Sequence, residues 1–307
     1  MKQFQAIQIP KANFVRYRIT HTTDYEYTGL VGHSYNEARL IPRECRHQQL
    51  ISAHLEITPK ETDFRLREDF FGNKIAYFAI TEPHSTFTVT AISEVEVFGN
   101  DRQLDLSRST SWEEVKDILK RDKHTEVLDA RQYTLDSPYI ITSPDLAAYA
   151  QPSFAPGRPL FEAVHDLMQR IHNDFTFDPK FTTLSTPVNT VLEHRRGVCQ
   201  DFAHLAIGCV RSYGLAARYV SGYIETLPPP GQEKLVGSDA SHAWFSVYLP
   251  NVGWMDFDPT NNQIPGDQHI VVAWGRGYGD VTPLKGVVFG GLDHELKVSV
   301  DVARLGP

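Results

Sequence analysis

Three short stretches of the sequence contain residue types that together could break an amide bond. Cys199 lies in Gly-Val-Cys-Gln-Asp, His242 lies in Ser-His-Ala-Trp, and Asp258 lies in Phe-Asp-Pro-Thr-Asn. In cysteine-dependent acyl transfer, a thiol attacks a carbonyl carbon, an imidazole moves protons, and a carboxylate orients the imidazole. The sequence therefore predicts a catalytic set with Cys199 as nucleophile, His242 as base and Asp258 as orienting acid.

Cys199 stands where a loop is expected to become a helix. The N-terminus of a helix carries partial positive charge and free backbone N–H groups, which favour a thiolate and can donate to an oxyanion. The alternative is a buried cysteine that only packs, and the matched His242 and Asp258 favour the nucleophile. Cys209 lies inside the same helix among apolar residues and is expected to pack, whereas Cys45 has no partner recognisable in the sequence.

The base and the acid are predicted to lie on two strands of one hairpin. His242 begins the first strand, and residues 254–258 form the second, in which Asp256 and Asp258 point to the same side. Periodicity does not choose between the two carboxylates, but the proline after Asp258 ends the strand and places this carboxylate level with His242. Trp244 shares the face of His242, where it would shield the imidazole or belong to the core.

Three residues near the catalytic set are expected to contact a substrate: Gln200, Asp201 and Trp244. For Asp201, the alternative is to cap free N–H groups at the helix start, which also complements the helix dipole. A metal site needs three or four clustered ligands, and the chain has neither Cys-x-x-Cys nor His-x-x-x-His. It also lacks a glycine-rich loop with phosphate-binding spacing. Neither a metal nor any other cofactor is therefore expected.

The order of the predicted elements indicates an α+β protein with two domains. Residues 14–98 contain several short strand-like runs separated by turns, with no helical period between them. They predict a β-rich, sandwich-like N-terminal domain over residues 1–105. A capping box at Ser111 opens a helical connector, residues 106–155. Residues 156–307 begin with helices and continue with strands, and they are predicted to be the catalytic domain.

Composition limits the partners that the protein is expected to have. The 307 residues are 41% hydrophobic and carry a formal net charge of −8. The acidic balance and the lack of a basic stripe argue against nucleic acid as a partner. No run approaches about 18 apolar residues, so no membrane association is expected. Three cysteines are not a disulfide framework, and no apolar leader segment is visible. These features predict a cytoplasmic protein, and they leave its oligomeric state unknown.

Beyond the three candidate residues, the similarity to a known family extends over nearly the whole chain. The stretches that carry it are residues 21–27, 36–43, 69–73, 196–204, 217–223, 242–244, 257–261 and 274–287. Together they resemble the transglutaminase-like superfamily, in its bacterial branch of predicted cysteine peptidases. The resemblance implies a papain-like α+β core, preceded by the β-rich domain of that branch. It also implies nucleophile, base and orienting acid at Cys199, His242 and Asp258.

Three positions depart from that family. Ala216, Ser246 and Gly277 stand where the family commonly has a proline, an acidic residue and an aspartate. None of them touches the catalytic set. The last two remove carboxylates that could shape a cleft, so no substrate preference follows from the resemblance.

The leading functional hypothesis is cleavage of a peptide or isopeptide bond in a peptide or protein substrate through a Cys199 thioester. Transamidation of protein glutamine by an amine is an alternative, because it differs only in what resolves the thioester. A binding module that keeps the fold without catalysis is a second alternative. The intact set of Cys199, His242 and Asp258 argues against the binding module.

Overall fold

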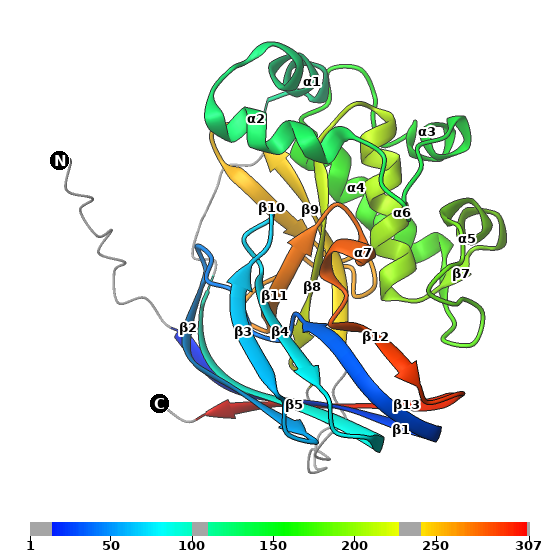
Figure 1. Ribbon diagram of the computed structural model, residues 1–307. Helices are drawn as coiled ribbons and strands as arrows, with labels where there is room; N and C mark the ends of the chain where they lie inside the picture. The colour runs from blue at the N-terminus through cyan, green and yellow to red at the C-terminus, as the bar shows by residue number, and fades with distance from the viewer. Residues whose placement is uncertain (1–13, 100–109, 227–240, 306–307) are drawn as a thin grey trace, which may run out of the picture.

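A computed structural model describes residues 14–99, 110–226 and 241–305 of the chain. Within these ranges the fold has two main sheets and a group of helices beside the second sheet (Figure 1). The helices are α1 (Trp112–Arg121), α2 (Thr125–Arg131), the 3-10 turn η2 (Gln132–Thr134), α3 (Pro144–Ala150), α4 (Leu160–Asp174), α5 (Val188–His194), α6 (Cys199–Ser212) and α7 (Tyr278–Val281). The strands are β1 (Phe14–Ala38), β2 (Gln48–Thr58), β3 (Asp63–Glu68), β4 (Lys74–Ile80), β5 (His84–Phe98), β6 (Thr176–Phe177), β7 (Arg196–Gly197), β8 (Ala217–Ile224), β9 (Ser241–Leu249), β10 (Gly253–Phe257), β11 (His269–Gly275), β12 (Leu284–Gly290) and β13 (His294–Leu305).

Local capping signals place the starts of two helices. The Ser111 side chain accepts a hydrogen bond from a backbone N–H of the first turn of α1, and Ser143 does the same for α3. Pro144 occupies the first position of α3, where its missing N–H costs nothing. After α6, the chain turns at Gly214 with φ of +76°, a conformation that glycine adopts without strain. The helix start predicted at Ser111 is confirmed.

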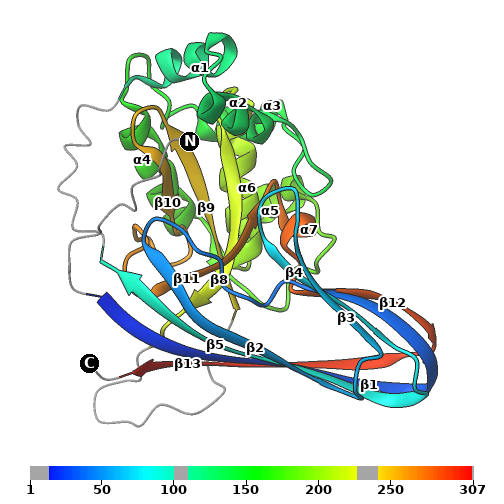
Figure 2. The same cartoon turned by 60° about the vertical axis from the view of Figure 1, so that its left-hand side comes forward.

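The β-rich N-terminal module is one strongly curved sheet, a half-barrel in place of the expected sandwich (Figure 2). The long strand β1 explains this shape, because other strands pair with it along both of its edges. Its first half pairs with β5 and β13, and its second half pairs with β4 and β12. Register shifts near residues 26–33 separate the two halves, and bulges of this kind bend a sheet. A separate apolar cluster lines the curve.

The two C-terminal strands belong to this first sheet. The predicted boundaries group residues 284–305 with the catalytic domain, but β12 and β13 both pair antiparallel with β1. The chain thus leaves the first sheet after β5, builds the helices and the second sheet, and returns to the edge of β1. The boundary predicted between residues 105 and 106 lies outside the described residues, and the domain limits stay a prediction.

The half of the molecule predicted to be catalytic contains a four-stranded sheet in the order β10–β9–β8–β11. Helix α6 packs against β8 and β9, and the largest fully buried side chains of this half are Trp244, Phe245 and Phe257. The same apolar core continues into the first sheet through Tyr17, Val95 and neighbouring residues. This arrangement confirms the α+β class. Among the described residues, no helix is both long and apolar enough to cross a membrane.

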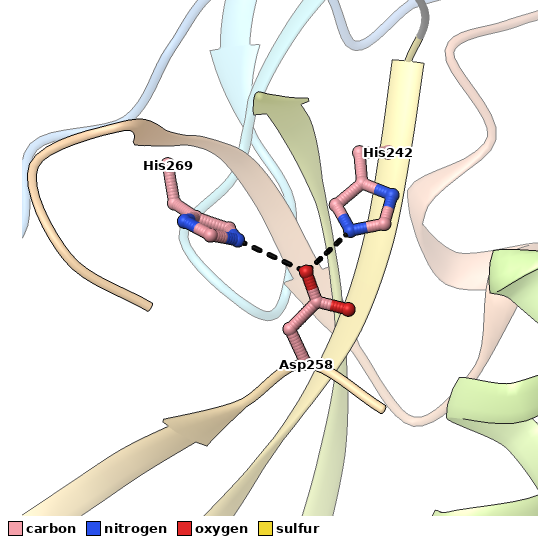
Figure 3. Close-up of side chains that lie close together, drawn as sticks. All are labelled: His242, Asp258 and His269. Carbon is pink, nitrogen blue, oxygen red and sulfur yellow. Dashed lines mark hydrogen bonds and ion pairs between the residues drawn. The ribbon is translucent and has the colours of Figure 1, made fainter. Parts of the chain in front are cut away.

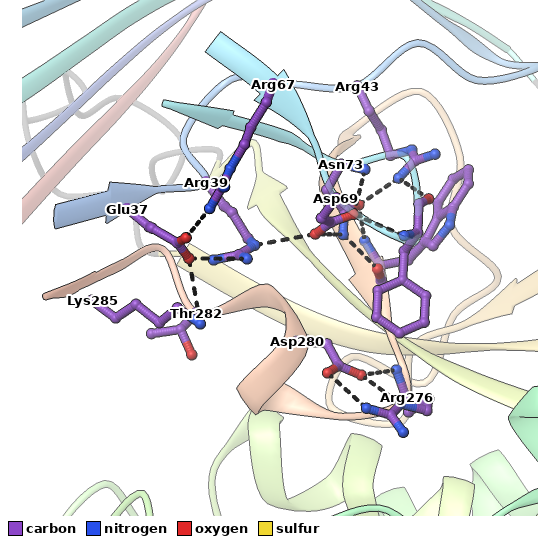
Figure 4. Close-up of polar contacts among 12 residues, drawn as sticks. Glu37, Arg39, Arg43, Arg67, Asp69, Asn73, Arg276, Asp280, Thr282 and Lys285 are labelled. Carbon is purple, nitrogen blue, oxygen red and sulfur yellow. Dashed lines mark hydrogen bonds and ion pairs between the residues drawn. The ribbon is translucent and has the colours of Figure 1, made fainter. Parts of the chain in front are cut away.

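The first sheet also holds the open edge of β11 through two side-chain amides, those of Gln48 and Asn73; Asn73 is drawn in Figure 4. Gln48 donates from Nε2 to the Val271 carbonyl at 2.8 Å and accepts from the Val271 N–H at 2.8 Å. Asn73 donates to the Trp274 carbonyl at 2.8 Å and accepts from its N–H at 2.9 Å. These amides replace a neighbouring strand, so the edge is closed to other chains. The N-terminal sheet therefore fixes the position of the strand that begins at His269.

Candidate active site

Cys199 is the first residue of α6 and is partly exposed. Asp201, in the first turn of the helix, turns back and accepts hydrogen bonds from the Val198 N–H at 2.8 Å and the Thr182 hydroxyl at 2.6 Å. A side chain at Gly197 would place a Cβ 2.8 Å from Asp201, so this turn requires a glycine. Burial raises the pKa of Asp201, although both hydrogen bonds act in the opposite direction. The contacts assign Asp201 to capping the loop that presents Cys199.

His242, at the start of β9, points its ring at Asp258, which follows β10 (Figure 3). Its Nε2 atom lies 2.8 Å from Asp258 Oδ2, and this leaves Nδ1 as the ring nitrogen available to the thiol. Cys199 is the other group that, together with Asp258, raises the pKa of this buried ring. The choice of Asp258 over Asp256 agrees with this geometry. Asp256 pairs with Ser246 farther along the hairpin.

Asp258 is fully buried and accepts hydrogen bonds on both carboxylate oxygens. Oδ2 accepts from His242, from His269 Nε2 at 3.1 Å and from Asn261 Nδ2 at 2.8 Å. Oδ1 accepts from the backbone N–H groups of Thr260 at 3.0 Å and Asn261 at 3.3 Å. The turn after the Asp-Pro step therefore locks the carboxylate in one orientation. A locked carboxylate can hold the His242 ring in a single tautomer.

Sequence reasoning missed His269 and gave no role to Asn261. Asn261 lies in the same short stretch as Asp258, so its closeness in the sequence could have predicted a contact with that carboxylate. His269 has no comparable signal, because it only begins a predicted strand. It reaches Asp258 because the chain crosses the end of the sheet between β10 and β11.

The electrostatics of the pair favour an imidazolium beside a carboxylate. Burial lowers the pKa of His242, but its hydrogen bonds to Asp258 and Cys199 and the charges of these two groups raise it to about 10. Burial would raise the pKa of Asp258, whereas hydrogen bonds from His242, His269 and Asn261 hold it below its ordinary value. The site can therefore keep a proton on His242 at neutral pH. Such a proton is what a leaving amine needs.

The other predicted substrate contacts differ in their exposure. Gln200 is partly exposed at the start of α6. Trp244 has no exposed surface, and its ring centre lies 5.9 Å from that of His242 and 5.2 Å from that of His269. Trp244 and the buried Asp201 are thus out of reach of a substrate in this structure. The position of Trp244 fits the alternative that it shields the imidazole from water.

His242, Asp258 and His269 also offer ligand atoms that lie within 4.8 Å of one another, so they could hold a cation. Their contacts are those of hydrogen bonds, because one oxygen accepts from both rings. A metal there would occupy the ring nitrogen that faces Asp258 and would separate the base from its orienting acid. The expected absence of a metal stays a prediction.

Two further residues of α6 have structural roles. His204 is buried, and its Nε2 atom accepts the backbone N–H of Tyr278 at 3.1 Å. Burial lowers the pKa of His204 to about 3, so its ring is neutral. Cys209 is fully buried, and burial raises the pKa of its thiol to about 12. Both residues pack inside the core, as their place on the helix predicted.

Comparisons with known proteins agree with this architecture. Residues 17–96 match the bacterial transglutaminase-like N-terminal region, and residues 147–259 match the transglutaminase-like superfamily. An uncharacterized protein of Mycobacterium tuberculosis (strain H37Rv) is 42% identical over 98% of this chain and 97% of its own length. A protein-glutamine gamma-glutamyltransferase of Pseudomonas aeruginosa is 31% identical over 103 residues, which cover 32% of this chain and 15% of that protein.

One solved structure shares the fold along almost the whole chain. It is a crystal structure of a protein from Cytophaga hutchinsonii that has been proposed to be a cysteine protease. The TM-score is 0.75 and the identity 20%, over 96% of this chain and 92% of that one. With the two matched regions and the mycobacterial relative, this likeness assigns the fold. The chain belongs to the transglutaminase-like superfamily and carries the bacterial transglutaminase-like N-terminal region.

Proposed function

We propose that this protein is a cysteine-dependent hydrolase that cleaves peptide or isopeptide bonds through a Cys199 thioester. The observation that carries the proposal is the buried, hydrogen-bonded pair of His242 and Asp258, with Cys199 at the start of α6 helping to raise the pKa of the same imidazole. A partly exposed thiol at a helix start, next to a protonated imidazole and a fixed carboxylate, is the arrangement that acyl transfer requires. No metal or organic cofactor takes part in the proposed reaction.

In the proposed reaction, the Cys199 thiolate attacks the amide carbonyl carbon, and the carbonyl oxygen becomes an oxyanion. The backbone N–H of Cys199 at the start of α6 donates to it. His242 gives its proton to the leaving amine, and a thioester remains on Cys199. His242 then takes a proton from water, whose oxygen attacks the thioester and releases the acid. Asp258 stays ionised throughout and keeps the His242 ring oriented.

Transamidation is the second candidate. The partial similarity to the Pseudomonas aeruginosa protein-glutamine gamma-glutamyltransferase favours it. The two reactions share every step up to the thioester and differ in whether water or an amine resolves it. We propose a peptide or protein as the substrate in either case. We propose no nucleic-acid or membrane partner, and a cytoplasmic location.

The test is turnover of a set of fluorogenic peptide amides and glutamine-containing proteins, with and without a fluorescent primary amine. The parent protein is compared with Cys199→Ala. Hydrolysis predicts amine-independent product release and a trapped acyl group on Cys199 by intact mass. Loss of the thiol should lower kcat/KM by several orders of magnitude, about 10³-fold or more. Incorporation of the amine would assign transamidation instead. Equal turnover by folded Cys199→Ala would rule out the thioester.

A further inference from the structure

The structure contains a second thiol–imidazole pair, remote in sequence from the first. Cys45 Sγ lies 3.6 Å from His47 Nε2 and 3.8 Å from His47 Nδ1. Both side chains are partly exposed. The bridge between Cys45 and Gln48 closes the chain into a tight turn here, so the two side chains are held together. No partner of Cys45 is recognisable in the sequence, because two residues of separation specify a contact only once the turn is known.

Buried cations surround this pair. Arg43 and Arg218 both lie against the Trp274 ring, at 3.3 Å and 3.7 Å from its centre. Their side chains are more than nine-tenths buried, and their Nε atoms have no hydrogen-bond partner among the described residues. Trp274 packs against the same small apolar cluster as Cys45. Burial lowers the pKa of both arginines, and the charge of Cys45 opposes this. An electropositive, partly exposed setting is where reactive cysteines occur.

His47 adds a further positive charge beside Cys45 when its ring is protonated. Burial lowers the pKa of His47, but the hydrogen bond to Cys45 and the charges of Cys45 and Asp256 raise it to about 9, against the opposing charge of Arg218. His47 can therefore receive the proton of the thiol. Asp256 is the carboxylate on the neighbouring hairpin, and it contributes one negative charge against the two arginines.

Cys45 also packs against the back of the candidate active site. It contacts the small cluster formed by Val220, Trp244 and Val271. Within this cluster, the Trp244 ring lies 5.9 Å from the His242 ring, and Val271 is the residue of β11 that Gln48 holds. An oxygen added on the side of the Cys45 sulfur that faces this cluster displaces part of it, because protein interiors have no spare volume.

We propose that Cys45 is a second reactive thiol, a site of oxidation by hydroperoxides, whose modification displaces Trp244 behind His242. The thiol proton passes to His47, and the sulfur attacks one peroxide oxygen. The S–O bond forms as the O–O bond breaks, and the leaving hydroxide takes the proton from His47 as water. Cysteine is oxidised to sulfenic acid and the peroxide is reduced. This inference does not depend on the reaction at Cys199.

The first test uses the full chain with Cys199→Ala, which leaves Cys45 and Cys209 as its cysteines. Hydrogen peroxide is added, sulfenic acid is trapped with dimedone, and adducts are located by peptide mass spectrometry. We expect the adduct on Cys45 and not on the buried Cys209. His47→Gln should slow it at least about tenfold, since it removes the proton acceptor. His54→Gln, the same change at an exposed histidine of β2, should leave the rate unchanged.

A synthetic peptide of residues 40–50 provides a reference that needs no folding. It contains Cys45 and His47 without Arg218 or the packed cluster, so it should react at least about tenfold more slowly than the folded protein if the cationic setting matters. No adduct on Cys45 in the folded protein would overturn the proposal. So would a peptide that reacts as fast as the protein.

The second test follows the indole N–H signals of the same protein by NMR before and after oxidation. The signals of Trp244 and Trp274 should shift, and that of Trp112, on α1, should stay in place as an internal control. Unchanged Trp244 and His242 signals after complete Cys45 oxidation would refute the displacement. Neither test requires a substrate, so their failure is distinct from a failure of the hydrolase proposal.

Discussion

Replacing Asp258 with asparagine tests the geometry of the candidate site most directly, because the two side chains have the same shape and differ in charge and hydrogen bonding. Asp258 accepts five hydrogen bonds, three on Oδ2 and two on Oδ1. An amide can accept on only one of these two positions. The better orientation keeps its oxygen toward His242, His269 and Asn261 and turns its NH₂ group toward two backbone N–H groups.

This count gives the size of the effect. Two backbone donors lose their acceptor, and water compensates in part because Thr260 is partly exposed and Asn261 is exposed. At about 0.5–1.5 kcal/mol for each lost hydrogen bond, the free energy of unfolding should fall by about 1–3 kcal/mol. The pKa of His242 should fall from about 10, because the charge and hydrogen bond of Asp258 help to raise it. The ring would then adopt the wrong tautomer in part of the molecules. A corresponding change in a serine protease lowers kcat about 10⁴-fold, and we expect a loss of about 10³–10⁴-fold here.

The assay combines kcat/KM on a substrate of the parent, a denaturant titration and the His242 ring signals by NMR across pH. Asp256→Asn is the matched control: the same change two residues away on the same hairpin. It should keep the His242 titration and turnover within about threefold of the parent, as expected for a group outside the reacting atoms. Parent-like turnover in folded Asp258→Asn, or a larger loss in Asp256→Asn, would refute the assignment of the orienting acid.

Three more outcomes follow from the same contacts. Iodoacetamide near neutral pH should label Cys199 well before Cys209, whose buried thiol has a pKa raised to about 12; peptide mapping decides this, and labelling of Cys209 first would contradict the nucleophile assignment. The pKa of His242 is raised in the folded state from 6.5 to about 10, so its stabilising effect is complete below pH 6.5 and lost as pH rises through 10. Chemical denaturation should show the decline, at up to about 1.4 kcal/mol per pH unit, with a smaller slope in Asp258→Asn. Gly222→Ala would place a Cβ 2.0 Å from the Ile270 carbonyl oxygen and 2.6 Å from the Trp244 ring. It should cost at least about 1–3 kcal/mol and lower activity, whereas Gly266→Ala, with open space around its Cβ, should melt like the parent.

The residues of the candidate site could be predicted where their signals are local. Cys199 follows a glycine at a helix start, and Asp258 precedes a proline at a strand end, so short stretches specify their backbone settings. The choice between Asp256 and Asp258 rested on the proline alone, and the structure brings Asp258 to His242. Trp244 shows the limit of such reasoning. Strand periodicity places it on the face of His242 but cannot tell an exposed substrate contact from a buried wall.

The parts that could not be predicted depend on pairing between distant segments. His269 joins Asp258 because β11 crosses the end of the sheet, and no residue beside it marks that crossing. Residues 284–305 pair with β1 although more than 250 residues separate them from its start. Because they directly follow the predicted catalytic domain in the sequence, they were predicted to belong to it. The residues of a strand do not specify which other strand pairs with it, because strands of many different sequences can form hydrogen bonds with either edge.

The N-terminal half-barrel helps to position the candidate active site. The carboxylate of Asp258 takes one of its hydrogen bonds from His269, the first residue of β11. β11 is an edge strand of the catalytic sheet, and an edge strand is free to fray unless something closes it. Gln48 and Asn73 close it with paired amide contacts, and Arg43 in turn donates to Asn73. The orientation of the acid in the catalytic half therefore depends on side chains of the other half. This dependence gives a physical reason for the two regions to be held in one chain, with β12 and β13 returning from the catalytic half to pair with β1.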